Sequence, residues 1–181
     1  ENSAWFYAGK ILLVDDTKAN LIFLARLLSA EGYEVRVCQS GRLALEMAIA
    51  DPPDLMISDI RMPEMDGYEL CHQLKAHPET QNVPVIFISV LDNVTEKAKA
   101  FEAGGIDYIT KPFDAREVLL RVKTHIRMQV LYSQVIEQNR LLKDEIILRQ
   151  SIEVQLRNAE EKFKKVFYAS PNPATITLLE N

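Results

Sequence analysis

Between residues 10 and 126, short apolar runs alternate with stretches in which apolar residues recur every three or four positions. The short runs predict buried β-strands, because an apolar run of about four to eight residues between turn residues is typical of a strand covered on both faces. These runs are residues 10–14, 34–38, 55–58, 85–89 and 106–110. Their alternation with helical patterns predicts βαβ units and a five-stranded parallel sheet with helices on both faces.

Each predicted strand is followed by a predicted helix, and the spacing of apolar residues indicates which side of the helix faces the sheet. The expected inward residues are, in chain order, Leu21, Leu24, Ala25 and Leu28; Ala44, Leu45 and Ala48; Leu70 and Leu74; Val94, Ala98 and Phe101; and Val118, Leu119, Val122 and Ile126. The links between these elements contain glycine and proline, which supports separate elements.

The chain has neither glycine nor proline between Asp114 and Ser170, and its apolar period changes there. Steps of four and three residues connect eleven positions, of which all but three are apolar: Leu131, Val135, Gln138, Leu142, Glu145, Arg149, Ile152, Leu156, Ala159, Phe163 and Val166. This spacing favours a coiled coil, and we expect a parallel homodimer whose helix, if continuous from Asp114 to Phe167, is about 80 Å long. The polar positions weaken its middle. Packing of this stripe against the chain's own sheet is the alternative.

Composition limits the class of protein. The 181 residues carry a formal net charge of −5, which argues against a general nucleic-acid binder. No apolar stretch is long enough to span a membrane, and residues 1–9 lack the pattern of a signal peptide. Cys38 and Cys71 form no spacing motif for a disulfide framework or a zinc site. We therefore expect a cytoplasmic protein.

Polar residues follow four of the predicted strands at their carboxyl ends. Asp15 and Asp16 follow the first strand, Asp59 the third, Ser89 ends the fourth and Lys111 follows the fifth. Ligands of parallel α/β sheets bind at this edge, so we expect these side chains to gather there. Three neighbouring carboxylates require a cation, and oxygen ligands at an open rim favour Mg²⁺. A carboxylate can also form an acyl phosphate, with the metal, lysine and hydroxyl stabilising the phosphoryl oxygens.

Other readings of the same residues are weaker. The chain lacks a P-loop and a G-x-G-x-x-G after the first strand, and the sequence after Asp59 is Ile-Arg rather than the D-x-D of haloacid-dehalogenase-like phosphatases. The sequence also shows no second motif, which argues against a metal-dependent phosphatase that acts on an external substrate. Asp15 and Asp16 alone could also serve as a helix-capping signal.

Residues 10–126 resemble the receiver domain of bacterial two-component response regulators. The resemblance is carried by LLVDD around Asp15 and Asp16, SDIRMPEMDG around Asp59, VIFIS ending at Ser89, and YITKP containing Lys111. It implies the flavodoxin-like, doubly wound strand order 2-1-3-4-5. It also implies that Mg²⁺ binds to Asp16 directly, to Asp15 mainly through water, and to Asp59 and the backbone carbonyl of Arg61.

The same resemblance implies that Asp59 accepts a phosphoryl group from a histidine kinase or phosphotransfer protein. Lys111 and Ser89 would contact that group, and Tyr108 would rotate inward as Ser89 moves towards it. The Lys111–Pro112 peptide bond would be cis. Val90 and Leu91 depart from the family, which favours a small and a polar residue at these positions, so the phosphoryl lifetime is open.

The expected organisation is a leader over residues 1–9, a receiver over 10–126, a signalling helix or coiled coil over 127–168, and the truncated start of a PAS-like domain over 169–181. The last part is similar to a PAS entry through the stretch AEEKFKKVFYASPNPATITLL. We expect this fragment to be no enzyme itself, within a parent that ends in a histidine kinase or a cyclic-nucleotide enzyme. The alternative function is a pseudo-receiver that dimerises without phosphoryl transfer.

Overall fold

The computed structural model describes residues 9–90 and 94–169. The chain divides into two compact units, one ending at Val130 and the other beginning at Leu131. The expected leader, apart from Gly9, and the expected PAS-like start, apart from Ala169, lie outside the described residues, as does Leu91.

Five parallel strands form one sheet in the order β2-β1-β3-β4-β5, as expected. The strands are β1 (Lys10–Val14), β2 (Glu34–Cys38), β3 (Leu55–Asp59), β4 (Val85–Ser89) and β5 (Asp107–Thr110). Their bounds differ from the expected runs by one residue at the end of β3 and at the start of β5. The register pairs Asp59 with Ile88 and Ser89 with Thr110, so the ends of β3, β4 and β5 lie side by side.

Helices follow the strands in strict alternation. They are α1 (Lys18–Ala30), α2 (Gly41–Ala50), α3 (Gly67–Ala76), α4 (Val94–Glu102) and α5 (Ala115–Ala169). Asp66 caps the start of α3, since its Oδ1 accepts a hydrogen bond from the Glu69 backbone N–H at 2.8 Å. Such caps satisfy backbone donors that the first helical turn leaves unpaired.

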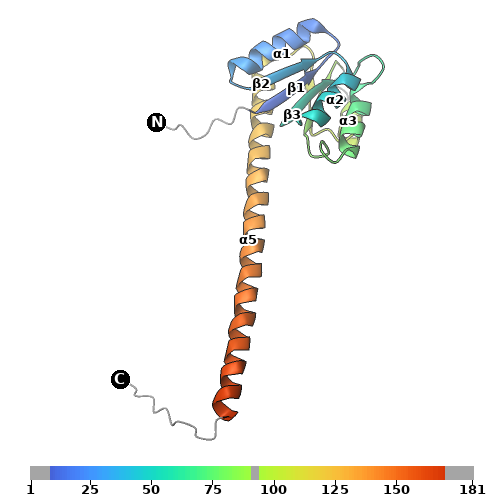
Figure 1. Ribbon diagram of the computed structural model, residues 1–181. Helices are drawn as coiled ribbons and strands as arrows, with labels where there is room; N and C mark the ends of the chain where they lie inside the picture. Colours follow the sequence, from blue (N-terminus) through green and yellow to red (C-terminus); the bar gives the residue numbers. More distant parts are fainter. Residues whose placement is uncertain (1–8, 91–93, 170–181) are drawn as a thin grey trace, which may run out of the picture. The chain divides into compact units, whose positions relative to one another are not determined.

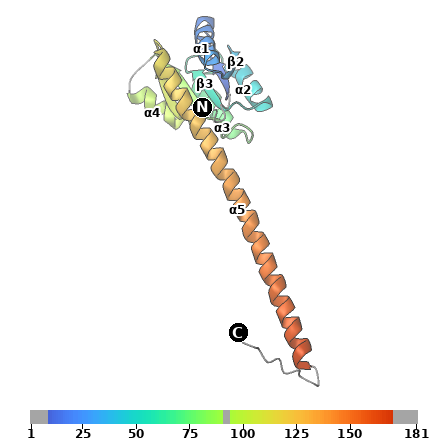
Figure 2. The same cartoon turned by 90° about the vertical axis from the view of Figure 1, so that its left-hand side faces the viewer.

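The core lies in two layers because successive strand residues point to opposite faces of the sheet. In β1, Leu12 and Val14 face α2, α3 and α4, whereas Ile11 and Leu13 face α1 and α5 (Figures 1 and 2). Each layer is almost fully buried. This double cover explains why the strands are continuous apolar runs rather than alternating ones.

The inward face of α4 differs from the expected one. Ala98 is exposed and the Phe101 side chain is 51% exposed, whereas Ala100 and Ala103 are buried against the sheet. On α4 it is Ala100 that is buried, whereas Ala103 follows the end of the helix, and this stretch of chain lies close to Phe87 of β4. Gly105 shows this closeness, since a Cβ atom there would overlap the Phe87 ring.

Helix α5 contributes to the core through its first turns. Val118, Val122 and Ile126 are buried in the layer that α1 also covers. In the second unit, the apolar members of the stripe that begins at Leu131 are exposed. No helix in residues 9–90 and 94–169 is long and apolar enough to cross a bilayer.

A charged network joins β5 to α5 at the edge of the sheet. Asp107 accepts hydrogen bonds from Arg121 at 2.6 Å and from the Tyr108 backbone N–H at 2.9 Å, and its Oδ2 lies 3.0 Å from Nε2 of His125. Arg121 also donates to Glu117 at 2.8 Å. Burial alone would raise the pKa of Asp107, but these hydrogen bonds outweigh it and the pKa lies below its ordinary value.

Replacing Asp107 by asparagine tests whether this network stabilises the fold. A lowered pKa means that the carboxylate contributes its full stability above the pKa of the unfolded chain, about 4, and loses it as the pH falls through the folded-state pKa. We expect Asp107→Asn to lower the free energy of unfolding by about 1–3 kcal/mol at neutral pH. Urea denaturation at several pH values should show the difference shrinking in acid.

Asp144→Asn is the matched control. Asp144 is exposed and pairs with Arg140 on the surface of α5, where an ion pair contributes little to stability. A difference between Asp107→Asn and the unsubstituted chain that stays constant on acidification would contradict the contribution assigned to the carboxylate.

Candidate functional site

The side chains expected at the rim come from strand ends that the parallel sheet places at one edge. Asp15 directly follows β1, Asp59 ends β3, Ser89 ends β4 and Lys111 follows β5. All three strands that supply Asp59, Ser89 and Lys111 are consecutive neighbours in the sheet. The backbone N–H of Lys111 donates to the Ser89 carbonyl at 2.8 Å, which ties the last two ends together.

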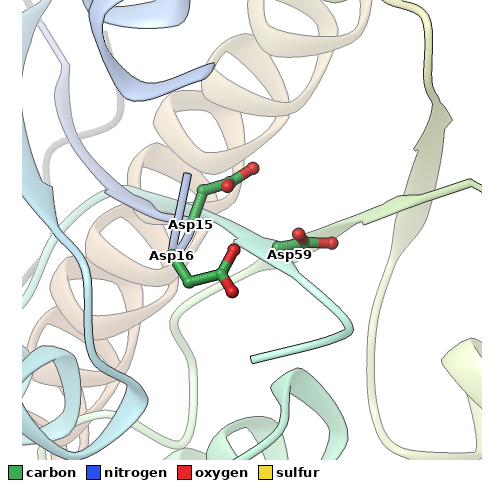
Figure 3. A group of neighbouring side chains, drawn as sticks. All are labelled: Asp15, Asp16 and Asp59. Carbon is green, nitrogen blue, oxygen red and sulfur yellow. The ribbon is translucent and has the colours of Figure 1, made fainter. Parts of the chain in front are cut away.

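Three carboxylates form the centre of the site. Asp15, Asp16 and Asp59 each offer an oxygen atom, and these atoms lie within 4.8 Å of one another. Figure 3 shows the three side chains at the ends of β1 and β3, with their carboxylates turned to the same side. Asp15 is 0% and Asp59 6% exposed, whereas Asp16 is exposed. The site therefore has a buried base and an open acidic edge.

Lys111 bridges the two buried carboxylates. Its Nζ lies 2.7 Å from Oδ2 of Asp59 and 3.0 Å from Oδ2 of Asp15. These partners are separated from it by 52 and 96 residues of chain. The contact requires the whole sheet to be assembled, so it forms only in the folded unit.

The pKa values reflect this crowding. Burial raises the pKa of Asp59 above its ordinary value, and the charge of Asp15 adds to the rise, although the Lys111 ammonium and the Arg61 backbone N–H oppose it. Burial alone would lower the pKa of Lys111, but its hydrogen bonds to Asp59 and Asp15 outweigh burial and raise it. A further cation beside Asp59 would favour the ionised carboxylate.

Two residues that the sequence did not point to hold Asp15 in place. The Thr17 backbone N–H donates to its Oδ1 at 2.8 Å, and the Asn20 amide donates to Oδ1 at 3.1 Å and to Oδ2 at 2.9 Å. The Thr17 contact is an Asx-turn, which an aspartate two residues before the N-cap of a helix could have indicated. No sequence signal pointed to Asn20.

The loop after β3 surrounds Asp59 with backbone. The side chain of Arg61 is exposed, and its backbone follows Ile60 in this loop. The loop closes on Gly67, whose N–H donates to the Ile60 carbonyl at 2.9 Å. A Cβ atom on Gly67 would overlap the backbone carbonyl oxygen of Asp59 and lie 3.0 Å from Cα of Ile60. Glycine therefore allows α3 to begin directly against the Asp59 backbone.

Tyr108 lies on β5 away from the carboxylates, partly buried beside α4 and α5. Its ring meets Phe101 edge to face at 6.5 Å between centroids. Nζ of Lys97 lies 4.5 Å and the guanidinium carbon of Arg121 5.6 Å from the ring centroid. Both cations are within the range of cation–π attraction. The Lys111–Pro112 bond is cis, as expected.

The donor set of the carboxylate cluster fits a small divalent cation. All three side-chain ligands are oxygen atoms, the cluster includes one exposed carboxylate, and Lys111 places one positive charge against the two buried carboxylates. Mg²⁺ binds through few carboxylates and keeps several waters, which suits this open edge. Val90, next to Ser89, is exposed at the same end of the sheet.

Comparisons with known proteins support this geometry. The sequence model of the response regulator receiver domain matches residues 11–123. The chain is 37% identical over 139 residues, 77% of its length, to a Vibrio cholerae protein named "Probable cyclic di-GMP phosphodiesterase". It is 38% identical over 128 residues, 71% of its length, to the response regulator PleD of Caulobacter vibrioides.

A solved structure is also similar. It is the receiver domain of a sensor histidine kinase from Pseudomonas aeruginosa PAO1, with a magnesium ion coordinated in its active site cleft. The match has a TM-score of 0.62 and 28% identity, and covers 66% of this chain and 98% of that one. By contrast, the chain spans only 31% and 28% of the lengths of the Vibrio and Caulobacter relatives.

Replacing Gly67 by alanine tests the close approach of α3 to Asp59. The new methyl group would overlap backbone rather than a flexible side chain, so Asp59 and Ile60 must move. We expect Gly67→Ala to lower the free energy of unfolding by about 1–3 kcal/mol in urea denaturation. Gly9→Ala is the control, because its Cβ would meet side-chain carbons of Ile126, the nearest at 2.9 Å, rather than backbone. Equal losses of unfolding free energy in Gly67→Ala and Gly9→Ala would contradict the cost assigned to the backbone overlap at Gly67.

Proposed function

This chain belongs to the response regulator receiver family, and from that premise we propose that it is the phosphoacceptor module of a two-component phosphorelay. Asp59 accepts a phosphoryl group from a histidine kinase or a phosphotransfer protein. Asp16 and Asp59 bind Mg²⁺ directly, Asp15 acts through water, and the backbone carbonyl of Arg61 completes the protein ligands. Lys111 and Ser89 contact the phosphoryl oxygens.

The bridge from Lys111 to both buried carboxylates is the observation that carries this proposal. A lysine placed there neutralises Asp59 before the reaction and is at hand to pair with phosphoryl oxygens after it. The acidic cluster supplies only oxygen ligands, the donor type that Mg²⁺ prefers. Two carboxylates that bind neither a cation nor a reactant seldom lie buried beside each other, because like charges repel.

The proposed step forms one bond and breaks another. A carboxylate oxygen of Asp59 forms a bond to phosphorus while the phosphorus–nitrogen bond of the donor's phosphohistidine breaks. The electron pair of the broken bond stays on the imidazole nitrogen, which takes a proton from solvent. Bound Mg²⁺ supplies charge compensation for the phosphoryl oxygens. Lys111 orients Asp59 through Oδ2, and the raised pKa of Asp59 explains why the carboxylate needs cations to react as the ionised nucleophile.

The response to phosphorylation is proposed to run through Ser89 and Tyr108. The acyl phosphate carries a charge of roughly −2 where the carboxylate carried −1, and this additional negative charge favours movement of Ser89 towards the phosphoryl group. Tyr108 then rotates inward and leaves its contacts with Phe101 and the two neighbouring cations. In this proposal the receiver covers residues 10–126 and the signalling helix 127–168, which passes the change to an output module. The cyclic di-GMP name of the Vibrio relative supports a cyclic-nucleotide enzyme as that output.

A second copy of the chain is the proposed partner of the long helix. The large apolar members of its stripe are 51–74% exposed in the single chain: Leu131, Val135, Leu142, Ile152, Leu156, Phe163 and Val166. Helices with this spacing bury such a stripe against one another as a coiled coil. Exposed apolar patches of this extent mark interaction surfaces. A homodimer through this helix follows from the pattern.

Phosphorylation is tested with Mg²⁺ and acetyl phosphate as a small-molecule donor. We expect intact-protein mass spectrometry to show a gain of about 80 Da, the mass of one added phosphoryl group. Asp59→Asn removes the nucleophile and should abolish the gain. Asp54→Asn is the matched control, because Asp54 is an aspartate at the opposite end of β3 that binds the Lys10 backbone N–H at 2.7 Å. It should keep the full gain.

The outcomes separate the two functions that the sequence allows. An adduct that persists in Asp59→Asn would exclude Asp59 as the acceptor. A chain that gains no mass and binds no Mg²⁺, yet dimerises, would be the pseudo-receiver platform instead.

Leu142→Glu tests the dimer. It places a charge in the middle of the apolar stripe, and we expect light scattering to show the monomer mass where the unsubstituted chain shows the dimer mass. Ile147→Glu is the control, since Ile147 is also exposed on α5 but lies outside the stripe. An unchanged mass for Leu142→Glu would mean that the stripe packs elsewhere.

A further inference from the structure

The Asp15 carboxylate differs from its neighbours because both of its oxygens are engaged by several protein donors. Oδ1 accepts from the Thr17 backbone and from the Asn20 amide, and Oδ2 accepts from the Asn20 amide and from Lys111. A single amide nitrogen of Asn20 lies within reach of both oxygens, so three donor groups surround a carboxylate that offers about four lone-pair sites. The Asp15 side chain is also almost fully buried. Its oxygens are therefore more fully engaged by the protein than those of an exposed carboxylate.

The other two carboxylates are less engaged. Asp16 is exposed, and its Oδ1 accepts a hydrogen bond from the Thr17 hydroxyl at 3.2 Å. Asp59 accepts from Lys111 and from the Arg61 backbone N–H. The difference between Asp15 and this pair is made largely by Asn20, which supplies two of the four contacts to Asp15 from the first turn of α1.

We propose that Asn20 is a positioning residue that reserves Asp15 for Lys111 and keeps it out of direct contact with the divalent cation. This inference rests on the proposed function, because it concerns how the cation is shared among the three carboxylates. Asn20 acts through Asp15: its amide occupies both carboxylate oxygens and fixes the plane of the carboxylate. The cation is thereby left to Asp16, Asp59 and water.

Removing the amide has a thermodynamic consequence with a definite sign. Asn20→Leu keeps a side chain of similar size but leaves acceptor positions of a buried carboxylate without the amide donor, which destabilises the chain without metal. A cation can fill these positions, and the partial positive charge of the amide hydrogens no longer opposes it. Asn20→Leu should therefore lower the stability of the metal-free chain and raise its affinity for Mg²⁺. Mg²⁺ that binds to the folded state should then restore part of the lost stability.

The experiment measures both quantities on the full chain. We expect Asn20→Leu to lower the melting temperature by roughly 3–8 °C in EDTA. This deficit should narrow in saturating Mg²⁺, and the Mg²⁺ affinity in calorimetric titration should rise about tenfold. Asn20→Ser keeps one donor, so its melting temperature and its Mg²⁺ affinity should lie between those of the unsubstituted chain and Asn20→Leu. It also provides a second measurement if Asn20→Leu folds poorly. Gln73→Leu is the matched control: its amide donates to the Glu69 carboxylate at 3.2 Å on α3, and its loss should leave Mg²⁺ affinity unchanged.

A double variant assigns the effect to Asp15. In an Asp15→Asn background, Asn20→Leu should give no gain in Mg²⁺ affinity, because the carboxylate that would be released is absent. A melting temperature that drops equally in EDTA and Mg²⁺, with unchanged or weaker Mg²⁺ binding, would overturn the inference and leave Asn20 a packing residue. That result leaves the proposed function standing as long as the unsubstituted chain binds Mg²⁺. Failure of the unsubstituted chain to bind Mg²⁺ would overturn both.

Discussion

The arrangement of the site depends on the ammonium group of Lys111. Asp15 and Asp59 are buried side by side, and burial together with the charge of Asp15 raises the pKa of Asp59, which a positive charge between them opposes. Lys111 supplies that charge from the end of β5, a strand that pairs with neither β1 nor β3. A shift of β5 by one residue would turn alternate side chains to the opposite face and break both ion pairs. The two ion pairs of Lys111 therefore require both the observed strand order and the observed register.

This constraint explains why so much of the rim could be predicted from the sequence. A strand covered on both faces must be a continuous apolar run, and a polar residue at its end marks where burial stops. Asp59 and Lys111 could be placed on this basis alone, because parallel strands bring their carboxyl ends to one edge. The order of the strands is different: it came from the resemblance to receivers, since apolar runs do not say which strands are neighbours. The observed order agrees with it.

The features that escaped prediction depend on side-chain size and on local hydrogen bonding. For α4, Ala98 and Phe101 were expected to face inward, but both are exposed and Ala100 is buried instead. Hydrophobicity favours burial of phenylalanine, whereas the close approach of this stretch of chain to the Phe87 ring favours small side chains. Asn20 was missed for a related reason. An amide in the first turn of a helix is ordinary in sequence, and its value appears only when a buried carboxylate lies beside it.

The proposed route from the rim to α5 has a physical reason to run along charged side chains rather than through the core. Val118 and Val122 are close-packed under the sheet, and displacing them would open cavities. At the edge of β5, in contrast, Arg121 contacts the Tyr108 ring and also binds Asp107, and such contacts can exchange partners with little change in packing. Tyr108 and Lys111 are three residues apart on the same edge of the sheet. The proposed rearrangement at the rim would therefore reach α5 at Arg121, where charged side chains hold the helix and can exchange partners.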